Sequence, residues 1–129
     1  MHPQCCPYRG NDSALWASKG VHNNTFNNKN IVYLVECQKD NCKEKYIAES
    51  HRKLKDRLQE HKGYINNTHL NQPTGFHFNK QGHTLSDMKI IILEKVKKRD
   101  NFYRKEREKY LIRKCNTYNQ GMNGNQGSA

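Results

Sequence analysis

Ile31-Val32-Tyr33-Leu34-Val35 is the stretch of this 129-residue chain that decides its fold. The run is nearly all apolar and rich in β-branched side chains, and no glycine or proline interrupts it. A short run of this kind is typical of a central strand that is buried on both faces of a sheet. The sequence therefore predicts a fold that is built around this strand.

Two further strands are predicted downstream of it. Gln38-Lys39-Asp40-Asn41 supplies turn residues, and Lys45-Tyr46-Ile47-Ala48 then has the composition of a strand that returns along the first. Together they predict a β-hairpin. A third strand is predicted over residues 88–96, because Ile90-Ile91-Ile92-Leu93 is β-branched and too short for an isolated helix.

Helices are predicted between and after these strands. The first covers about residues 52–65, and Ser50 stands where a helix cap is expected. Its inward stripe is predicted to be Leu54, Leu58, His61 and Ile65. The second is a long charged helix over about residues 101–116. Its inward-facing residues are predicted to be Tyr103, Tyr110, Leu111 and Cys115. Residues 66–87 are expected to form a polar connection with one short helix near 76–78.

This order of elements predicts an α+β fold with a small three-stranded, mainly antiparallel sheet flanked by helices. The domain is expected to span residues 29–124. Residues 1–28 are predicted to be an irregular leader, because they offer turn residues and little periodicity. Residues 125–129 are predicted to be a frayed tail.

The chain is strongly basic. It carries 23 lysines and arginines against 12 acidic residues, which gives a formal net charge of +11. This balance favours a polyanionic partner such as nucleic acid, bound through phosphate contacts that weaken with salt. The basic runs 95–99 and 104–113 are expected to face that partner. The alternative is a solvated basic surface without a partner.

The sequence gives no sign of a membrane or an export route. No window approaches the roughly 18 apolar residues that a membrane span needs, and residues 1–20 lack the apolar core of a signal peptide. The cysteine count is odd, at five. We therefore expect an intracellular, reducing compartment, with metal ligation in place of a disulfide framework.

Two short-spaced pairs predict a metal site. Cys37 and Cys42 are separated by four residues, and His77 and His83 by five. Two thiols and two imidazoles form a tetrahedral zinc set. Because the pairs are far apart in sequence, such a site would pin the hairpin turn to the connection 66–87 and replace core that the composition does not supply. The alternative is two incidental thiols and two surface histidines.

A second set of polar residues is spread over two predicted strands and two predicted helices. It consists of Tyr33, Tyr46, Arg57, His61 and Glu108. Such a set could place a phenol, a guanidinium and a carboxylate around a phosphodiester. These residues can also be explained without a functional site. Tyrosine is a favoured strand residue, and Glu108 has the spacing of a surface salt bridge with Arg104 on a helix. Arg57 and His61 are residue types that are common on a helix surface.

These motifs resemble those of a known family. Ile31-Val32-Tyr33 and Tyr46-Ile47-Ala48 look like the two signature motifs of the GIY-YIG nuclease superfamily. The similarity continues through Arg57 and His61, Glu106-Arg107-Glu108 and Gly121-Met122-Asn123. More narrowly, residues 29–124 resemble the endonuclease domain of Penelope-like retroelements. The segments that carry this narrower likeness are 32–37, Cys42, 46–49, 77–79 and 82–83.

The resemblance implies a metal-dependent DNA endonuclease that hydrolyses phosphodiester bonds, nicking one strand. Glu108 would bind a catalytic Mg²⁺ (or Mn²⁺) ion, and Tyr33 would be the general base with Tyr46 assisting. Arg57 would clamp the phosphate, and His61 would orient a hydroxyl or accept a proton. Asn123 would support the site or a phosphate, its alternative being a loop asparagine that caps a turn. The Cys37, Cys42, His77 and His83 set would hold a structural Zn²⁺ ion.

Two positions depart from the family pattern. Ile31 and Ala48 stand where the superfamily motifs have glycine. If position 48 needed a positive φ or a close approach to DNA, a methyl group would impair it. A catalytically impaired nucleic-acid-binding module therefore remains the alternative function, and a zinc-stabilised interaction domain is a third.

The retroelement likeness also sets expectations about context. It predicts a nuclear location if the chain is a eukaryotic retroelement product. The start at Met1 and the short leader suggest a truncated or free-standing copy without a polymerase.

Overall fold

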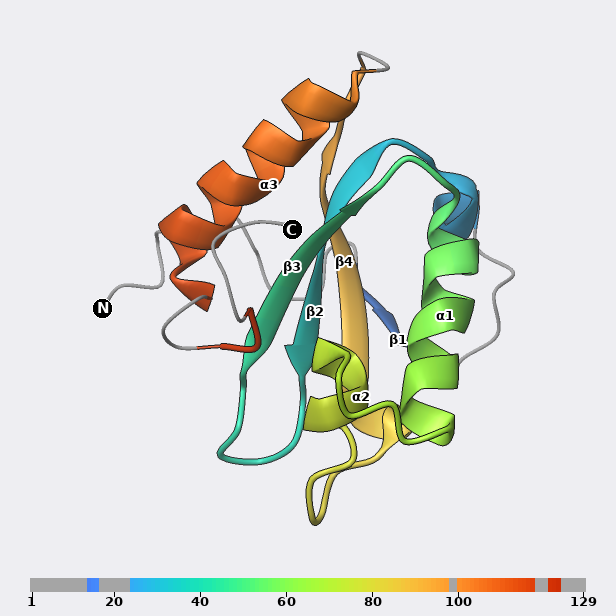
Figure 1. The fold of residues 1–129 in the computed structure, drawn as a ribbon, viewed down its shortest axis with the longest axis vertical. Coiled ribbons are helices and arrows are strands. Elements are labelled where there is room, and N and C mark those ends of the chain that lie inside the picture. Colours follow the sequence, from blue (N-terminus) through green and yellow to red (C-terminus); the bar gives the residue numbers. More distant parts are fainter. Residues whose placement is uncertain (1–13, 17–23, 98–99, 118–120, 124–129) are drawn as a thin grey trace.

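A computed structural model describes residues 14–16, 24–97, 100–117 and 121–123 (Figure 1). Its strands are β1 (Ala14–Trp16), β2 (Ile31–Cys37), β3 (Lys45–Ser50) and β4 (Met88–Lys95). Its helices are α1 (Leu54–Asn66), α2 (Pro73–His77) and α3 (Asn101–Cys115), with 3₁₀ turns at Asn24–Asn27 and Leu85–Asp87. The strands form one sheet in the order β1-β4-β2-β3, and all neighbouring pairs are antiparallel. The predicted α+β class with an antiparallel sheet and flanking helices is confirmed.

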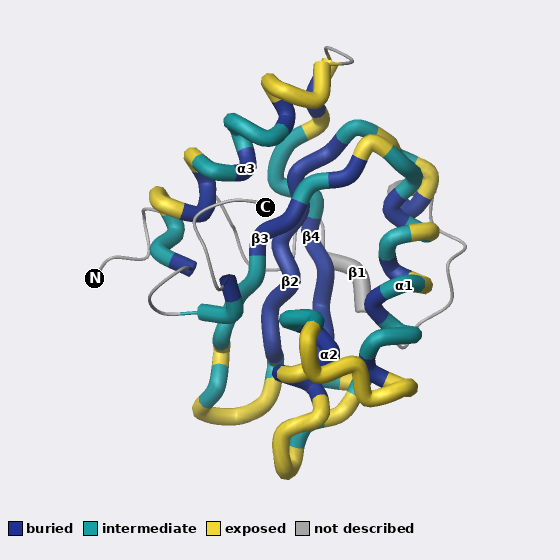
Figure 2. Tube along the Cα trace, in the orientation of Figure 1, coloured by how far each residue is buried: buried dark blue, intermediate teal, exposed yellow. Residues whose placement is uncertain are grey.

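Strand β2 lies inside the sheet, and all its residues are buried, as its apolar run predicts (Figure 2). Alternate residues serve the two faces of the sheet. Tyr33 and Val35 pack in one apolar cluster with residues of α1, while Val32 and Leu34 pack in another with residues of α3. Helices therefore cover both faces. Because β3 is at the edge of the sheet, side chains from both faces can meet around it.

Helix α1 has the predicted inward stripe. Its buried residues are Leu54, Leu58, His61 and Ile65. The predicted cap is wrong, because Ser50 is the last residue of β3 and its Oγ accepts a hydrogen bond from the Arg52 backbone N–H at 3.0 Å. The hydroxyl thus shapes the turn from β3 into α1. Lys53 occupies the N-cap position without a side-chain hydrogen bond.

Two further predictions are corrected by the structure. Residues 14–16, within the predicted irregular leader, form β1 and pair with β4, so the described sheet has a fourth, short strand. On α3, Tyr103 and Tyr110 are 40% and 42% exposed rather than inward-facing. The buried residues of α3 are instead Arg104, Glu108, Leu111 and Ile112. The rest of the predicted leader (1–13 and 17–23), Lys98, Arg99 and the predicted tail (125–129) lie outside the described residues.

No helix in the described part of the chain combines the length and the apolar character that crossing a bilayer requires.

Candidate active site and metal cluster

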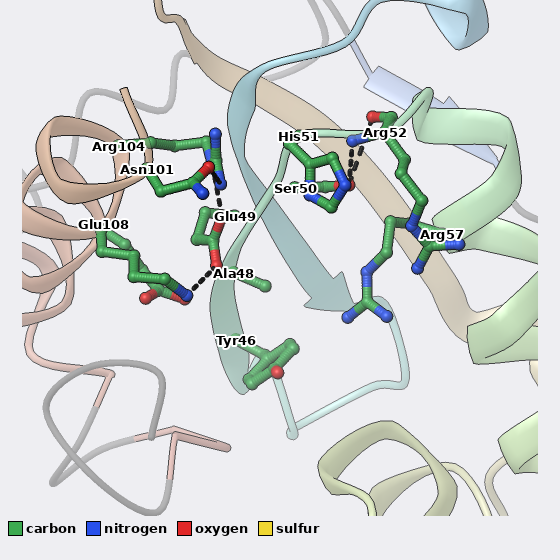
Figure 3. A pocket seen from close by; sticks show the side chains of 11 residues that line it. Tyr46, Ala48, Glu49, Ser50, His51, Arg52, Arg57, Asn101, Arg104 and Glu108 are labelled. Carbon is green, nitrogen blue, oxygen red and sulfur yellow. Dashed lines mark hydrogen bonds and ion pairs between the residues drawn. The ribbon is translucent and has the colours of Figure 1, made fainter. Parts of the chain in front are cut away.

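A pocket of about 410 Å³ opens at the free edge of β3. Tyr46 and Ala48 of β3 line it, together with Arg57 of α1 and Glu108 of α3. Figure 3 shows Arg57 extending from α1 toward Tyr46, with Glu108 on the opposite side of the strand. The edge position of β3 explains this meeting, because α1 and α3 cover opposite faces of the sheet. The structure thus brings three of the predicted site residues to one cavity.

Tyr33 lies behind this pocket, inside the core. Its side chain is fully buried, and its hydroxyl is 2.7 Å from His61 Nε2 and accepts a hydrogen bond from Arg57 Nε at 3.3 Å. Burial raises the pKa of Tyr33 well above its ordinary value of 10, while the neighbouring Arg57 opposes that rise. In this conformation the Tyr33 hydroxyl does not contact solvent.

Tyr46 is the tyrosine that lines the pocket wall. Its side chain is only half-buried. Burial raises the pKa of Tyr46, and the positive charge of Arg57 again works in the opposite direction. Of the two signature tyrosines, Tyr46 is therefore the one that a water molecule in the pocket can reach.

Arg57 connects the buried and the open parts of the site. Besides its hydrogen bond to Tyr33, it pairs with Glu60 one turn along α1, and Glu60 also accepts from Arg52 at 2.7 Å. These contacts fix the guanidinium at the pocket wall. A guanidinium held in this way can present N–H donors to two oxygens of a phosphate.

Glu108 is held at the pocket by the way α3 docks on the sheet. One turn before it, the buried Arg104 donates to Glu49 of β3, to Asn30 at 2.8 Å and to Asn101 at 2.6 Å. Although burial alone would raise it, the pKa of Glu49 is lowered by hydrogen bonds from Arg104 and Lys105. The sequence suggests Glu108 as a partner for Arg104, and it does not reveal Glu49, since residues 55 apart in sequence give no spacing signal.

Asn123 supports β3 from its free edge. Its side-chain Oδ1 accepts from the Ile47 backbone N–H at 2.8 Å, and its Nδ2 donates to the Ile47 carbonyl at 2.9 Å. One amide side chain thus satisfies the outward backbone groups of Ile47, as a neighbouring strand would. Since Ile47 lies between Tyr46 and Ala48, Asn123 fixes the strand that forms the pocket wall.

Ala48 lies inside β3, opposite Tyr33 in the β2–β3 register. It is not among the described residues with a positive φ. Alanine at this position therefore costs no backbone strain. Its methyl group forms part of the pocket wall.

The four predicted metal ligands form a second cluster, away from the pocket. One ligand atom from each of Cys37, Cys42, His77 and His83 lies within 4.8 Å of every other. Cys37 ends β2 and His77 ends α2, whereas Cys42 and His83 lie in the following loops. The cluster therefore joins the hairpin turn to the connection 66–87, as the sequence predicts.

The surroundings of the two imidazoles fit metal ligation through Nε2. His77 Nε2 is 3.4 Å from Cys42 Sγ, close to the roughly 3.5 Å edge of a tetrahedral zinc site. His83 Nε2 is buried and has no hydrogen-bond partner among the described residues. On the other side of the rings, His77 Nδ1 faces Glu44 at 3.6 Å and His83 Nδ1 faces the Gln81 carbonyl at 3.3 Å. Ligating histidines have outer partners of this kind.

Protein stability is expected to depend on pH through His61. Burial, aided by the charge of Arg57, lowers the pKa of His61 to about 3, against about 6.5 in an unfolded chain. The unfolded chain therefore binds a proton that the folded protein does not, and the stabilisation present above pH 6.5 is lost as the pH falls toward 3. At pH 5 the expected loss is about 2 kcal/mol.

Denaturant unfolding at pH 7 and pH 5 measures this loss. The His61→Gln variant, which has no imidazole at this position, is expected to show a smaller difference between the two pH values. An identical difference in the variant and the wild type would contradict the assignment.

Comparison with known proteins identifies the family to which this chain belongs. A family model described as the GIY-YIG catalytic domain matches residues 29–123. No curated protein and no solved structure matches the chain. GIY-YIG catalytic domains are phosphodiesterase nuclease domains, which act on nucleic acid and use a divalent metal ion. Because the match spans both tyrosine motifs, Arg57, Glu108 and Asn123, the chain belongs to the GIY-YIG family.

Proposed function

We propose that this domain is a Mg²⁺-dependent DNA endonuclease that nicks one strand of a duplex. The observation that carries the proposal is the pocket at the edge of β3, where Tyr46, Arg57 and Glu108 meet. Phosphodiester hydrolysis needs a positioned water, charge stabilisation of the transition state and a ligand for a hard cation. The pocket offers a side chain suited to each need.

Glu108 is the residue that would hold the catalytic cation, Mg²⁺ or Mn²⁺. Its buried side chain lines the pocket, and hard cations prefer carboxylate oxygens. The other carboxylate of the pocket, Glu49, is engaged by Arg104 and Lys105. When bound, the cation would supply charge stabilisation to a phosphate oxygen.

The two tyrosines are proposed to have different roles, because Tyr33 is fully buried and Tyr46 lines the pocket. The resemblance assigns the general base to Tyr33, but a fully buried hydroxyl does not meet a water in the pocket. We therefore assign the contact with the attacking water to Tyr46. Tyr33 instead accepts a hydrogen bond from Arg57 and holds the guanidinium in place.

Replacing Arg57 with alanine is expected to lower turnover about a hundredfold or more while weakening DNA binding only a few-fold. The reason is that the guanidinium stabilises charge that develops in the transition state. Single-turnover nicking rates and the Kd for the same DNA, at one salt concentration, separate the two effects. Lys62→Ala, which removes one positive charge from the same helix outside the pocket, is the matched control, with nicking near the wild-type rate. Equal losses in turnover and affinity for Arg57→Ala would reduce Arg57 to a docking contact.

Supercoiled plasmid provides the test of the function. Incubation with Mg²⁺ is expected to yield the nicked circle, and incubation in Mg²⁺-free buffer is expected to leave the plasmid supercoiled. Binding should weaken steeply as salt rises, because the net charge of +11 favours phosphate contacts. Absence of nicking by the wild type with Mg²⁺ would overturn the proposal.

The alternative function is a nucleic-acid-binding module without cleavage. Ala48 favours it, because the methyl group occupies pocket wall where the family motif has glycine. Tight, salt-sensitive DNA binding without nicking by the wild type is the outcome expected from this alternative.

We also propose that Cys37, Cys42, His77 and His83 hold a structural Zn²⁺ ion and that the domain derives from a Penelope-like retroelement. The gathered donor atoms and the outer partners of both imidazoles support the zinc. The same four residues are part of the likeness to Penelope-type nuclease domains. A reducing, intracellular setting, nuclear in a eukaryote, is the compartment that suits this origin.

A further inference from the structure

A buried chain of hydrogen bonds leads from α2 to the pocket. The Thr74 hydroxyl is 2.9 Å from His61 Nδ1, and His61 Nε2 is 2.7 Å from the Tyr33 hydroxyl. The Tyr33 oxygen in turn accepts from Arg57 Nε at 3.3 Å. Thr74, His61 and Tyr33 are each at most 2% exposed, so water does not substitute for any partner inside this chain.

The chemistry of Arg57 sets the direction of these hydrogen bonds. A guanidinium has only donors to offer, so Tyr33 must present a lone pair to it. The phenolic proton of Tyr33 then needs an acceptor, and His61 Nε2 is the nitrogen beside it. A neutral imidazole that accepts at Nε2 carries its proton at Nδ1. That proton points at the Thr74 hydroxyl.

The opposite tautomer would disrupt the chain. With a proton on Nε2, His61 and Arg57 would both donate to the Tyr33 oxygen, and the phenolic proton would lose its acceptor. A buried polar group that is left without a partner is destabilising, and the side chains shift to avoid it. The tautomer of His61 therefore bears on where the guanidinium of Arg57 sits in the pocket.

Thr74 is itself held firmly. It lies in the short helix α2, and a Cβ on the next residue, Gly75, would stand 2.2 Å from the His69 carbonyl oxygen and 2.9 Å from that of Tyr64. Only glycine allows α2 to lie this close to the end of α1. The other end of α2 carries His77 of the metal cluster.

We propose that Thr74 is a positioning residue of the active site, whose hydroxyl accepts the Nδ1 proton of His61 and thereby stabilises the tautomer that keeps Tyr33 and Arg57 in place. The hydrogen-bond chain fixes the tautomer whatever reaction the pocket performs, whereas the effect of Thr74 on turnover rests on the proposed function of Arg57 in phosphodiester cleavage.

The tautomer is measured directly by ¹⁵N NMR of the full chain with labelled histidine. The His61 resonances are identified by their loss in His61→Gln, since the chain has seven histidines. The wild type is expected to show a single Nδ1–H tautomer at neutral pH. Finding the Nε2–H tautomer in the wild type would overturn the proposal, whether or not the protein nicks DNA.

Two substitutions at Thr74 test its role in the reaction. Thr74→Val keeps the shape and removes the hydroxyl, so it is expected to lose the single tautomer and to lower the nicking rate about tenfold to a hundredfold, with little change in DNA affinity. Thr74→Ser keeps the hydroxyl and is expected to retain the tautomer and to stay within about threefold of the wild-type rate. A valine variant that keeps the tautomer, or a serine variant that loses it, would overturn the assignment.

Discussion

Replacing Glu108 with glutamine is expected to abolish plasmid nicking, with a loss of about a thousandfold or more, while DNA binding and the fold persist. The amide has nearly the shape of the carboxylate, so the packing of the buried side chain changes little. It removes the negative charge and the anionic oxygen that a hard cation needs. Nicking rates at several Mg²⁺ concentrations, together with the Kd for DNA, measure the effect.

The matched control for this variant is Glu106→Gln. Glu106 is on the same helix, is half-exposed and pairs with Lys109 at 3.5 Å, outside the pocket. Its replacement is expected to change the nicking rate by less than about twofold, because exposed ion pairs contribute little. Near-normal nicking by Glu108→Gln would remove Glu108 from the catalytic centre.

The Cys37→Ser, Cys42→Ser double variant is expected to lose bound zinc and to unfold at a temperature at least about 10 °C lower. The cluster ties the end of β2 to α2, in a chain that is only 33% hydrophobic. The free energy of zinc binding contributes directly to folding at such a site, and the loss of several kcal/mol shifts the melting temperature by this amount or more. Elemental analysis and thermal unfolding provide the two measurements.

Cys115→Ser is the control for the double variant. Cys115 is a half-buried thiol at the end of α3 and is not part of the cluster. This variant is expected to retain one zinc ion and to melt within a few degrees of the wild type. Stoichiometric zinc that survived the double substitution would exclude the proposed site.

Much of the fold could be predicted, because its strongest sequence patterns are local. The apolar run around Tyr33 predicts a strand that is covered on both faces of the sheet, and in the structure this run forms the fully buried strand β2. The stripe from Leu54 to Ile65 likewise identified the inner face of α1. By contrast, β1 has only three residues, and its place depends on pairing with β4, which no local pattern encodes.

The inner face of α3 was predicted incorrectly for a physical reason. Sequence reasoning placed the aromatic Tyr103 and Tyr110 inside, since large apolar groups are normally buried. The structure buries Arg104 instead, because Glu49 and two asparagines satisfy its guanidinium. A buried charge that is fully paired is a property of the tertiary structure. It leaves no trace in the sequence of either segment alone.

The sequence predicted which residues gather near the candidate site, but it did not predict which of them are buried and which line the pocket. The motifs brought Tyr33, Tyr46, Arg57 and Glu108 into one hypothesis. The order of the strands, with β3 at the edge and β2 inside, then decided which tyrosine lines the pocket. Thr74 was missed because its relevance rests on one contact with His61 across two helices. A threonine in a polar connection has no spacing pattern that would distinguish it.

The shortness of α2 has a practical consequence for identifying the ion that acts in cleavage. One five-residue helix carries both Thr74, which leads to the pocket, and His77, which belongs to the cysteine–histidine cluster. Treatment with EDTA would remove both of the proposed ions, Zn²⁺ and Mg²⁺. Adding back magnesium alone is then expected to leave the protein inactive, because α2 would no longer be anchored. Sensitivity to EDTA would thus implicate zinc and magnesium equally, whereas omitting magnesium from zinc-loaded protein isolates the effect of the ion proposed at Glu108.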